Sequence, residues 1–315
     1  MSRVQVLRPG LLTTVQDRGR VGWRHLGVAH AGALDPDALS LANRLVGNDD
    51  GCAVLEITLR GPALRLTAPT RVALLGAATD ARFDGTAVPM GRPVELPAGT
   101  LELGAVRGGA RSWLAFAGGI DTAAVLGSRS TDLRGGFGGV EGRALVAGDE
   151  WSLGQTSPID ADMPQATSWW IDPWHDVDPR APIRYRPGPH PLAASLSHGR
   201  WQVAASSNRQ GLRLRGDALA GVEAGGVSEP VAPGTIQLPP DGQPIVLLAD
   251  AQTVGGYPRL GHVIAADLPR LAQLCPGQAL TFAPCDAQTA QHAACAARAR
   301  VARIALMIDA RLPTV

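Results

Sequence analysis

The sequence predicts a mostly β protein, built as two β-barrel domains with a few short helices. Three observations support this fold class. Short apolar or alternating runs recur along the chain, 38 Gly and 25 Pro residues separate them, and few stretches show helical periodicity. A similar succession also occurs twice: a strand beginning at Gly99 or Gly234 leads to a very apolar strand and then to a Gly-Gly pair. This repetition favours two similar domains.

Nine segments have the length and patterning of strands. In chain order they are Arg3–Leu7, Ala53–Thr58, Ala63–Leu66, Arg71–Leu75, Thr100–Leu103, Ser112–Ala117, Trp201–Ala204, Gly234–Leu238 and Ile245–Leu248. Between residues 155 and 182, Ser, Pro, Asp and Trp accumulate without periodicity. We therefore expect an N-terminal β-barrel domain over residues 1–160 and a C-terminal one over residues 161–315.

Three short helices are expected among the strands. The first runs from Pro36 to Val46, because Asp35 suits the N-cap, Pro36 suits the first helical position and Gly47 follows as a stop. The second spans residues 267–274. An Ala-rich stretch over about 287–300 predicts the third, at the end of the C-terminal domain.

The basic residues are 29 arginines and no lysine. This excludes a Schiff-base lysine, a phosphate-binding loop of the GK[ST] type and covalent biotin on this chain. A net charge of +1 gives no general attraction to nucleic acid or to an anionic membrane, so neither is expected as a partner. Four cysteines without metal-ligand spacing, and no signal peptide or membrane span, predict reduced, mostly buried thiols, no metal site and a cytoplasmic location.

Two polar, Gly-punctuated clusters lie in the N-terminal half. The first includes Gln16, Asp17 and Arg20 and precedes the expected helix, a setting in which free N–H groups and arginines bind anions. The second is a Gly-rich loop in which Arg129 and Ser128 could hold a carboxylate or phosphate. Turns and surface loops have similar composition, so a purely structural role is the alternative for both.

Two further clusters lie in the C-terminal half. Residues 206–216 read as a half-buried strand with an arginine face, most simply a solvated one. Residues 250–262 follow the most apolar strand of the chain and contain Asp250, Gln252, Tyr257 and His262. Polar groups at the mouth of a barrel strand, with a histidine that can titrate near neutrality, predict a site. A structural histidine is the alternative.

In this order, the clusters resemble the family of the 5-oxoprolinase C subunit, also known as allophanate hydrolase subunit 2 and as part of the carboxyltransferase domain of urea carboxylase. The similarity extends over about residues 3–283. It rests on the strings over residues 10–20, 41–48, 55–58 with 61–62, 118–121, 126–133, 228–229 with 234–237, and 252–258.

The resemblance implies two cyclophilin-like β-barrel domains and a subunit that is inactive alone. Its partners would be a B subunit of related fold and an A subunit. The complex would be an ATP-dependent amidohydrolase that opens 5-oxo-L-proline to L-glutamate, with ATP acting at the level of the complex. ATP is needed because the lactam is an unactivated amide.

For such an enzyme we expect a polar cleft at or between the barrels, with Gln16, Asp17 and Arg20 on one wall and Asp250, Gln252, Tyr257 and His262 on the other. Proton transfer is assigned to Asp250, His262 or Asp17. The expected substrate-binding residues are Gln16, Arg20, Ser128, Arg129, Gln252, Thr253, Gly255, Gly256, Tyr257 and Arg259. Compared with the family's usual motifs, the chain departs at Ala29, Ala31, Gln210, Ala251 and Val254, which bears on the substrate.

Two other functions remain open on the same resemblance. One is a regulatory module that antagonises a histidine-kinase inhibitor. The other is a carboxyltransferase of the urea carboxylase or allophanate hydrolase type, working with biotin on another chain. A prolyl isomerase is suggested by the implied fold alone, and fold is a weak guide to activity.

Overall fold

The computed structural model describes residues 2–157, 159, 161–220 and 226–312, and these form two compact units. The first unit draws on residues 2–20, 31–175 and 300–312, and the second on residues 21–30 and 176–299. Each unit therefore includes chain from a distant part of the sequence. The domain border at residue 160 stays a prediction, and that residue lies outside the described ones.

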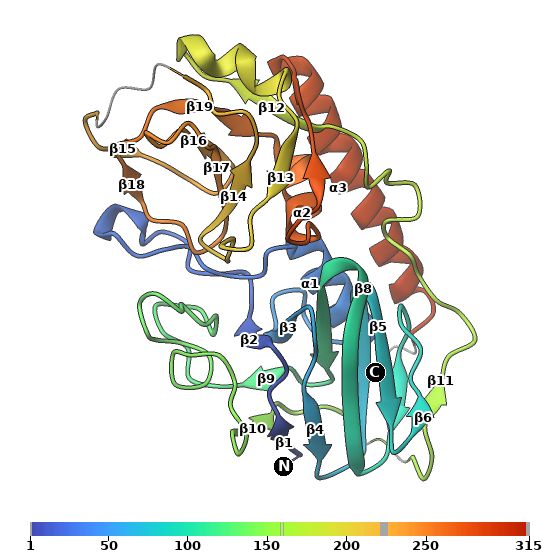
Figure 1. Cartoon of the computed structure of the whole chain (residues 1–315). Coiled ribbons are helices and arrows are strands. Elements are labelled where there is room, and N and C mark those ends of the chain that lie inside the picture. The colour runs from blue at the N-terminus through green and yellow to red at the C-terminus, as the bar shows by residue number, and fades with distance from the viewer. Residues whose placement is uncertain (1, 158, 160, 221–225, 313–315) are drawn as a thin grey trace. The chain divides into compact units, whose positions relative to one another are not determined.

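An 11-stranded sheet forms the first unit, in the order β11-β7-β5-β8-β4-β1-β10-β9, with β2 paired to β3, β3 to β8 and β6 to β5. Its strands are β1 (Arg3–Arg8), β2 (Leu12–Gln16), β3 (Val54–Thr58), β4 (Ala63–Leu66), β5 (Thr70–Phe83), β6 (Thr86–Ala87), β7 (Val94–Leu96), β8 (Gly99–Phe116), β9 (Ile120–Asp121), β10 (Glu150–Leu153) and β11 (Gln165–Ala166). The long strands β5 and β8 run side by side (Figure 1).

The helix α1 (Pro36–Leu45) packs on β5 and β8 of this sheet. Asp35 is its N-cap and accepts hydrogen bonds from the N–H groups of Asp37 and Ala38, as its sequence position predicts. Leu39, Leu41 and Leu45 are fully buried against the sheet. The apolar face of α1 thus closes one side of the core.

An eight-stranded sheet forms the second unit, in the order β20-β13-β14-β17-β16-β19-β12-β21, and β15 pairs with β18 beside it. The strands are β12 (Ile183–Pro187), β13 (Trp201–Val203), β14 (Gly211–Arg215), β15 (Glu229–Pro230), β16 (Thr235–Gln237), β17 (Ile245–Leu247), β18 (Val254–Gly255), β19 (Arg259–Val263), β20 (Ala279–Leu280) and β21 (Phe282–Pro284). The helical elements are η1 (Arg24–Leu26), η2 (Pro191–Ser197), η3 (Ala265–Asp267), α2 (Leu268–Ala272) and α3 (Ala287–Asp309), the last of which contributes to both units.

The segment 21–30 joins the second unit through Arg24. Its guanidinium donates hydrogen bonds to the carbonyl oxygens of Val231 and Gln252, the latter at 3.3 Å. Burial lowers the pKa of this guanidinium from its ordinary value. A residue from the first tenth of the chain therefore holds two loops that lie more than 200 residues further on.

These sheets confirm the mostly β fold class, and most expected elements occur near their predicted bounds. Two expectations were wrong in detail. The strands expected at Thr100–Leu103 and Ser112–Ala117 are one continuous strand, β8, because its ladder with β5 continues through the glycines between them. The C-terminal helix has 23 residues and is not short.

Candidate functional site

Three adjacent strands of the second unit form the floor of a small pocket. Ile245 of β17 lies opposite Arg213 of β14 on one side and opposite Gln237 of β16 on the other. Directly opposed residues of antiparallel strands project to the same face. Arg213 and Gln237 therefore flank Ile245 on one face of the sheet.

The pocket has a volume of about 130 Å³. Asn208, Gln210, Gln252 and Tyr257, all from loops, complete its lining. Sites for drug-sized ligands occupy about 300–1,000 Å³, so this pocket suits a small metabolite and is too small for a nucleotide.

Three glutamine side chains form a chain of hydrogen bonds at this pocket. Gln210 Nε2 donates to Gln252 Oε1 at 3.3 Å, and Gln252 Nε2 donates to Gln237 Oε1 at 3.3 Å. Gln237 is 1 % exposed, and within the described part of the chain its Nε2 has no hydrogen-bond partner. Buried polar groups are nearly always hydrogen-bonded, so this donor requires an explanation.

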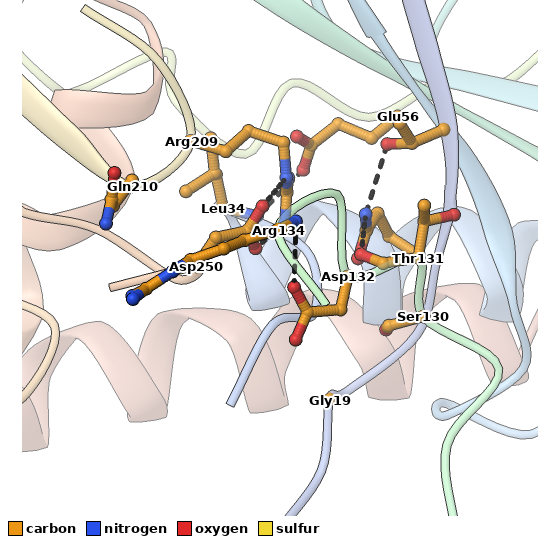
Figure 2. Close-up of polar contacts among 12 residues, drawn as sticks. Gly19, Leu34, Glu56, Ser130, Thr131, Asp132, Arg134, Arg209, Gln210 and Asp250 are labelled. Atoms are coloured by element: carbon orange, nitrogen blue, oxygen red, sulfur yellow. Dashed lines mark hydrogen bonds and ion pairs between the residues drawn. The ribbon is translucent and has the colours of Figure 1, made fainter. Parts of the chain in front are cut away.

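Asp250, one of the expected proton-transfer residues, forms a buried ion pair with Arg209. Figure 2 shows the guanidinium and the carboxylate facing each other, with Nε donating to Oδ2 and Nη2 to Oδ1, both at 2.9 Å. The two side chains are 2 % and 4 % exposed. This bidentate geometry gives Asp250 a structural role at the start of the polar loop, and its catalytic role stays a prediction.

His262 lies on β19, opposite Thr235 of β16. Its Nδ1 is 3.4 Å from the Thr235 hydroxyl, and its ring packs on Gly234. Although the residue as a whole is exposed, desolvation of the ring lowers the pKa of the imidazole from its ordinary value. His262 is not among the residues that line the pocket.

The remaining expected residues of this loop differ in their surroundings. Tyr257 is 44 % exposed at the pocket, whereas Arg259 forms a surface ion pair with Glu229 at 2.5 Å. Gly255, in β18, lies against the Gln237 amide. The carbonyl oxygens of Thr253 and Gly256 accept backbone hydrogen bonds from Val231 and Gly226. Of the predicted residues, the structure thus places Gln252 and Tyr257 on the pocket lining and Gly255 against a lining side chain.

In the first unit, the Asp17 carboxylate organises the Gly-rich loop. It accepts hydrogen bonds from the hydroxyls of Ser128 and Ser130, both at 2.6 Å, and from the N–H groups of Arg129 (2.5 Å) and Gly19 (2.8 Å). These four donors on one carboxylate hold the Gly-rich loop against the segment that contains Asp17 and Gly19. The structure therefore brings Asp17 and Ser128 together as predicted, in an arrangement that has a structural explanation.

Arg20 also supports this loop. It is 1 % exposed, donates from Nη2 to the Ser130 carbonyl at 2.5 Å, and lies 4.6 Å from the centre of the Phe137 ring. Gln16 is buried nearby in contact with the Thr131 carbonyl, whereas the Arg129 guanidinium is half-exposed and paired with Asp121 at 3.1 Å. A cleft that combines these residues with those of the second unit stays a prediction.

The described residues contain no cluster of three His, Cys, Asp or Glu side chains able to hold a metal ion. Among them, no helix is long and apolar enough to cross a membrane. The cysteines are free, but the expectation of buried thiols was wrong: Cys295 is exposed and the other three are half-buried.

Sequence reasoning missed Gln237, Arg213 and Gln210 as pocket residues. The local pattern places Arg213 on a solvated face and Gln237 at the end of a strand. A glutamine between the apolar residues Ile236 and Leu238 is the available signal, because a polar side chain at a buried position needs a partner.

The structure is a mostly β protein of two units with a small polar pocket, and comparison with known proteins identifies its family. A family model for the carboxyltransferase domain, subdomain A and B, matches residues 26–284, and the chain belongs to this family.

Three relatives indicate where the chain lies within the family. It is similar to the C subunit of 5-oxoprolinase from Escherichia coli, at 42 % identity over 92 % of this chain and 94 % of the relative. The protein of the same name in Haemophilus influenzae is 33 % identical over 88 % and 89 % of the two chains. The crystal structure of Kluyveromyces lactis urea carboxylase superposes with a TM-score of 0.84 at 28 % identity, covering 96 % of this chain but 29 % of that one.

Proposed function

We propose that this protein is the C subunit of an ATP-dependent 5-oxoprolinase, which converts 5-oxo-L-proline to L-glutamate together with A and B subunits. The observation that carries the proposal is the 42 % identity to the E. coli protein, which extends over nearly the full length of both chains. Similarity that spans whole chains supports a common role better than a shared fold does.

The pocket of the second unit does not fit ATP. It is far smaller than a nucleotide site, has one arginine in its lining and has no phosphate-binding loop. We therefore propose that the nucleotide binds elsewhere in the complex, that this chain is inactive alone, and that it contributes to recognition of the lactam. Free cysteines are consistent with the proposed cytoplasmic location.

Reconstitution tests this proposal. The purified chain is mixed with the A and B subunits encoded in the same genome, and glutamate formed from 5-oxo-L-proline is measured with and without ATP. We expect turnover only with all three chains and ATP. Turnover that does not change when this chain is omitted would reject the proposal.

A biotin-dependent carboxyltransferase is the second candidate, supported by the structural similarity to urea carboxylase. It predicts that activity depends on a biotin-carrying partner and is abolished by avidin. Avidin should leave 5-oxoprolinase activity unchanged, so one assay separates the two candidates. The regulatory role stays a prediction.

A further inference from the structure

We propose that the pocket between β14, β16 and β17 binds a small ligand that carries both an amide carbonyl and a carboxylate. The carbonyl oxygen accepts a hydrogen bond from Gln237 Nε2, and the carboxylate pairs with Arg213. This inference rests on the proposed function, because 5-oxoproline is a ligand of this class.

The first step is the donor at Gln237. Its Oε1 already accepts from Gln252, so the amide presents Nε2, which is buried and has no partner in the described chain. If the Gln237 amide alone were rotated by half a turn, its NH2 group would face the NH2 group of Gln252. The neighbouring glutamines therefore determine its orientation. Leaving such a buried donor unpaired is unfavourable, and a carbonyl oxygen in the pocket would satisfy it.

Gln210 and Gly255 hold this donor in position. Gln210 orients Gln252, and Gln252 in turn orients Gln237. A Cβ at position 255 would overlap the Gln237 Nε2 atom, so only glycine leaves the amide where it is. A fixed donor of this kind is typical of a specific binding site.

The second step is the cation. Arg213 lines the pocket, and within the described chain its guanidinium makes no hydrogen bond or ion pair. It lies two strands from Gln237 in the same row, with Ile245 between them. Neighbouring strands are about 4.8 Å apart, so the two backbones are separated by about 10 Å, and their side chains can contact the two ends of one small ligand.

The third step is selection by size and chemistry. About 130 Å³ admits a five-membered ring with two short substituents and excludes a nucleotide. The other lining side chains are amides, a phenol and aliphatic groups, so Arg213 is the charged group of the lining. An anion with a neutral carbonyl matches both polar features.

Binding to the full-length chain tests the proposal by calorimetry with three probes. The probes are 5-oxo-L-proline, 2-pyrrolidinone, which lacks the carboxylate, and L-proline, which lacks the carbonyl. We expect 5-oxoproline to bind more tightly than either. Equal affinity for all three, or no binding of 5-oxoproline at millimolar concentrations, would overturn the proposal.

Variants assign the two contacts. Gln237→Glu replaces the donor with acceptors and should weaken 5-oxoproline binding about tenfold or more, and Gln210→Met, at a half-buried position, should weaken it several-fold. Arg213→Gln should weaken 5-oxoproline binding about tenfold but leave 2-pyrrolidinone binding unchanged. Arg215→Gln is the matched control, because Arg215 is an exposed arginine of the same strand outside this pocket lining.

Two further measurements complete the test. Unchanged circular dichroism shows that each variant is folded, and if Gln237→Glu does not fold, Gln210→Met and Arg213→Gln decide the outcome. In the complex, the KM for 5-oxoproline should rise in the same order as the dissociation constants. An active complex whose KM is unaffected overturns this inference alone, whereas an inactive complex with variant-sensitive binding overturns the proposed function alone.

Discussion

Asp35 predicts a pH dependence of stability that can be calculated from its surroundings. Its Oδ1 caps α1 at 3.0 Å from two N–H groups, while within the described chain its buried Oδ2 has no partner. Desolvation raises the pKa of this carboxyl to about 7, and the charges of Asp37 and Glu56 raise it further against the lowering by the cap hydrogen bonds. The folded protein therefore holds a proton here that the unfolded chain releases near pH 3.8.

The sign and size of the effect follow from linkage. Between pH 3.8 and about 7 the folded state binds more protons at this residue, so its contribution to the free energy of unfolding falls as the pH rises. One pKa unit corresponds to about 1.36 kcal/mol, and the carboxyl is already half-ionised at pH 7, so the loss between pH 5 and pH 7 is about 2 kcal/mol. Asp35→Asn cannot titrate, and asparagine is an equally good N-cap, so the variant should lack this loss.

Urea unfolding followed by circular dichroism at pH 5, 6, 7 and 8 measures the free energy of unfolding of wild type and of Asp35→Asn. Asp80→Asn is the control, because Asp80 is exposed at a surface ion pair. We expect the free energy of unfolding of Asp35→Asn to rise relative to that of wild type as the pH increases. The Asp80→Asn control should show the same pH dependence as wild type. Parallel curves for wild type and Asp35→Asn would refute the reasoning.

Three shorter predictions concern other polar groups. Asp250→Asn should lower the free energy of unfolding by about 3–5 kcal/mol in urea titrations, because Arg209 loses a buried counter-charge; an unchanged midpoint would contradict this. Arg20→Met should keep the contact with Phe137 but lose the hydrogen bonds to the Gly-rich loop, so amide exchange over residues 125–139 should accelerate about tenfold. Desolvation lowers the pKa of His262 from 6.5, so its contribution to stability is lost as the pH falls below 6.5 and through the lower pKa of the folded protein. An NMR titration that gives a pKa above 6.5 would exclude this.

Local signals in the sequence are sufficient for much of the fold. The Asp35-Pro36 start and the Gly47 stop predict α1 to within one residue. By contrast, the glycines between residues 104 and 109 predict the end of a strand, whereas β8 continues through them. The pairing of Ala78 with Arg107 and of Thr79 with Val106 extends the ladder across this stretch, and such a long-range contact has no local signature.

The site is predictable only where its residues lie in one loop. Gln252 and Tyr257 belong to a single polar stretch, so the order of residues along the chain is enough to find them. Gln237 and Arg213 become neighbours only through the register of β14, β17 and β16 across Ile245. Their joint role therefore depends on which strands pair, and that information is absent from either segment alone.

The exchange of segments between the two units has a consequence for biosynthesis. The second unit includes residues 21–30, and the first includes residues 300–312, where Asp309 pairs with Arg44 at 2.7 Å. During synthesis, Arg24 leaves the ribosome long before Val231 and Gln252, whose carbonyl oxygens it binds, have been added to the chain. The first unit cannot be completed until residues 300–312 are synthesised, and in the second unit residues 21–30 must wait for residues 176–299. We therefore expect fragments cut near residue 160 to be poor substitutes for the intact polypeptide.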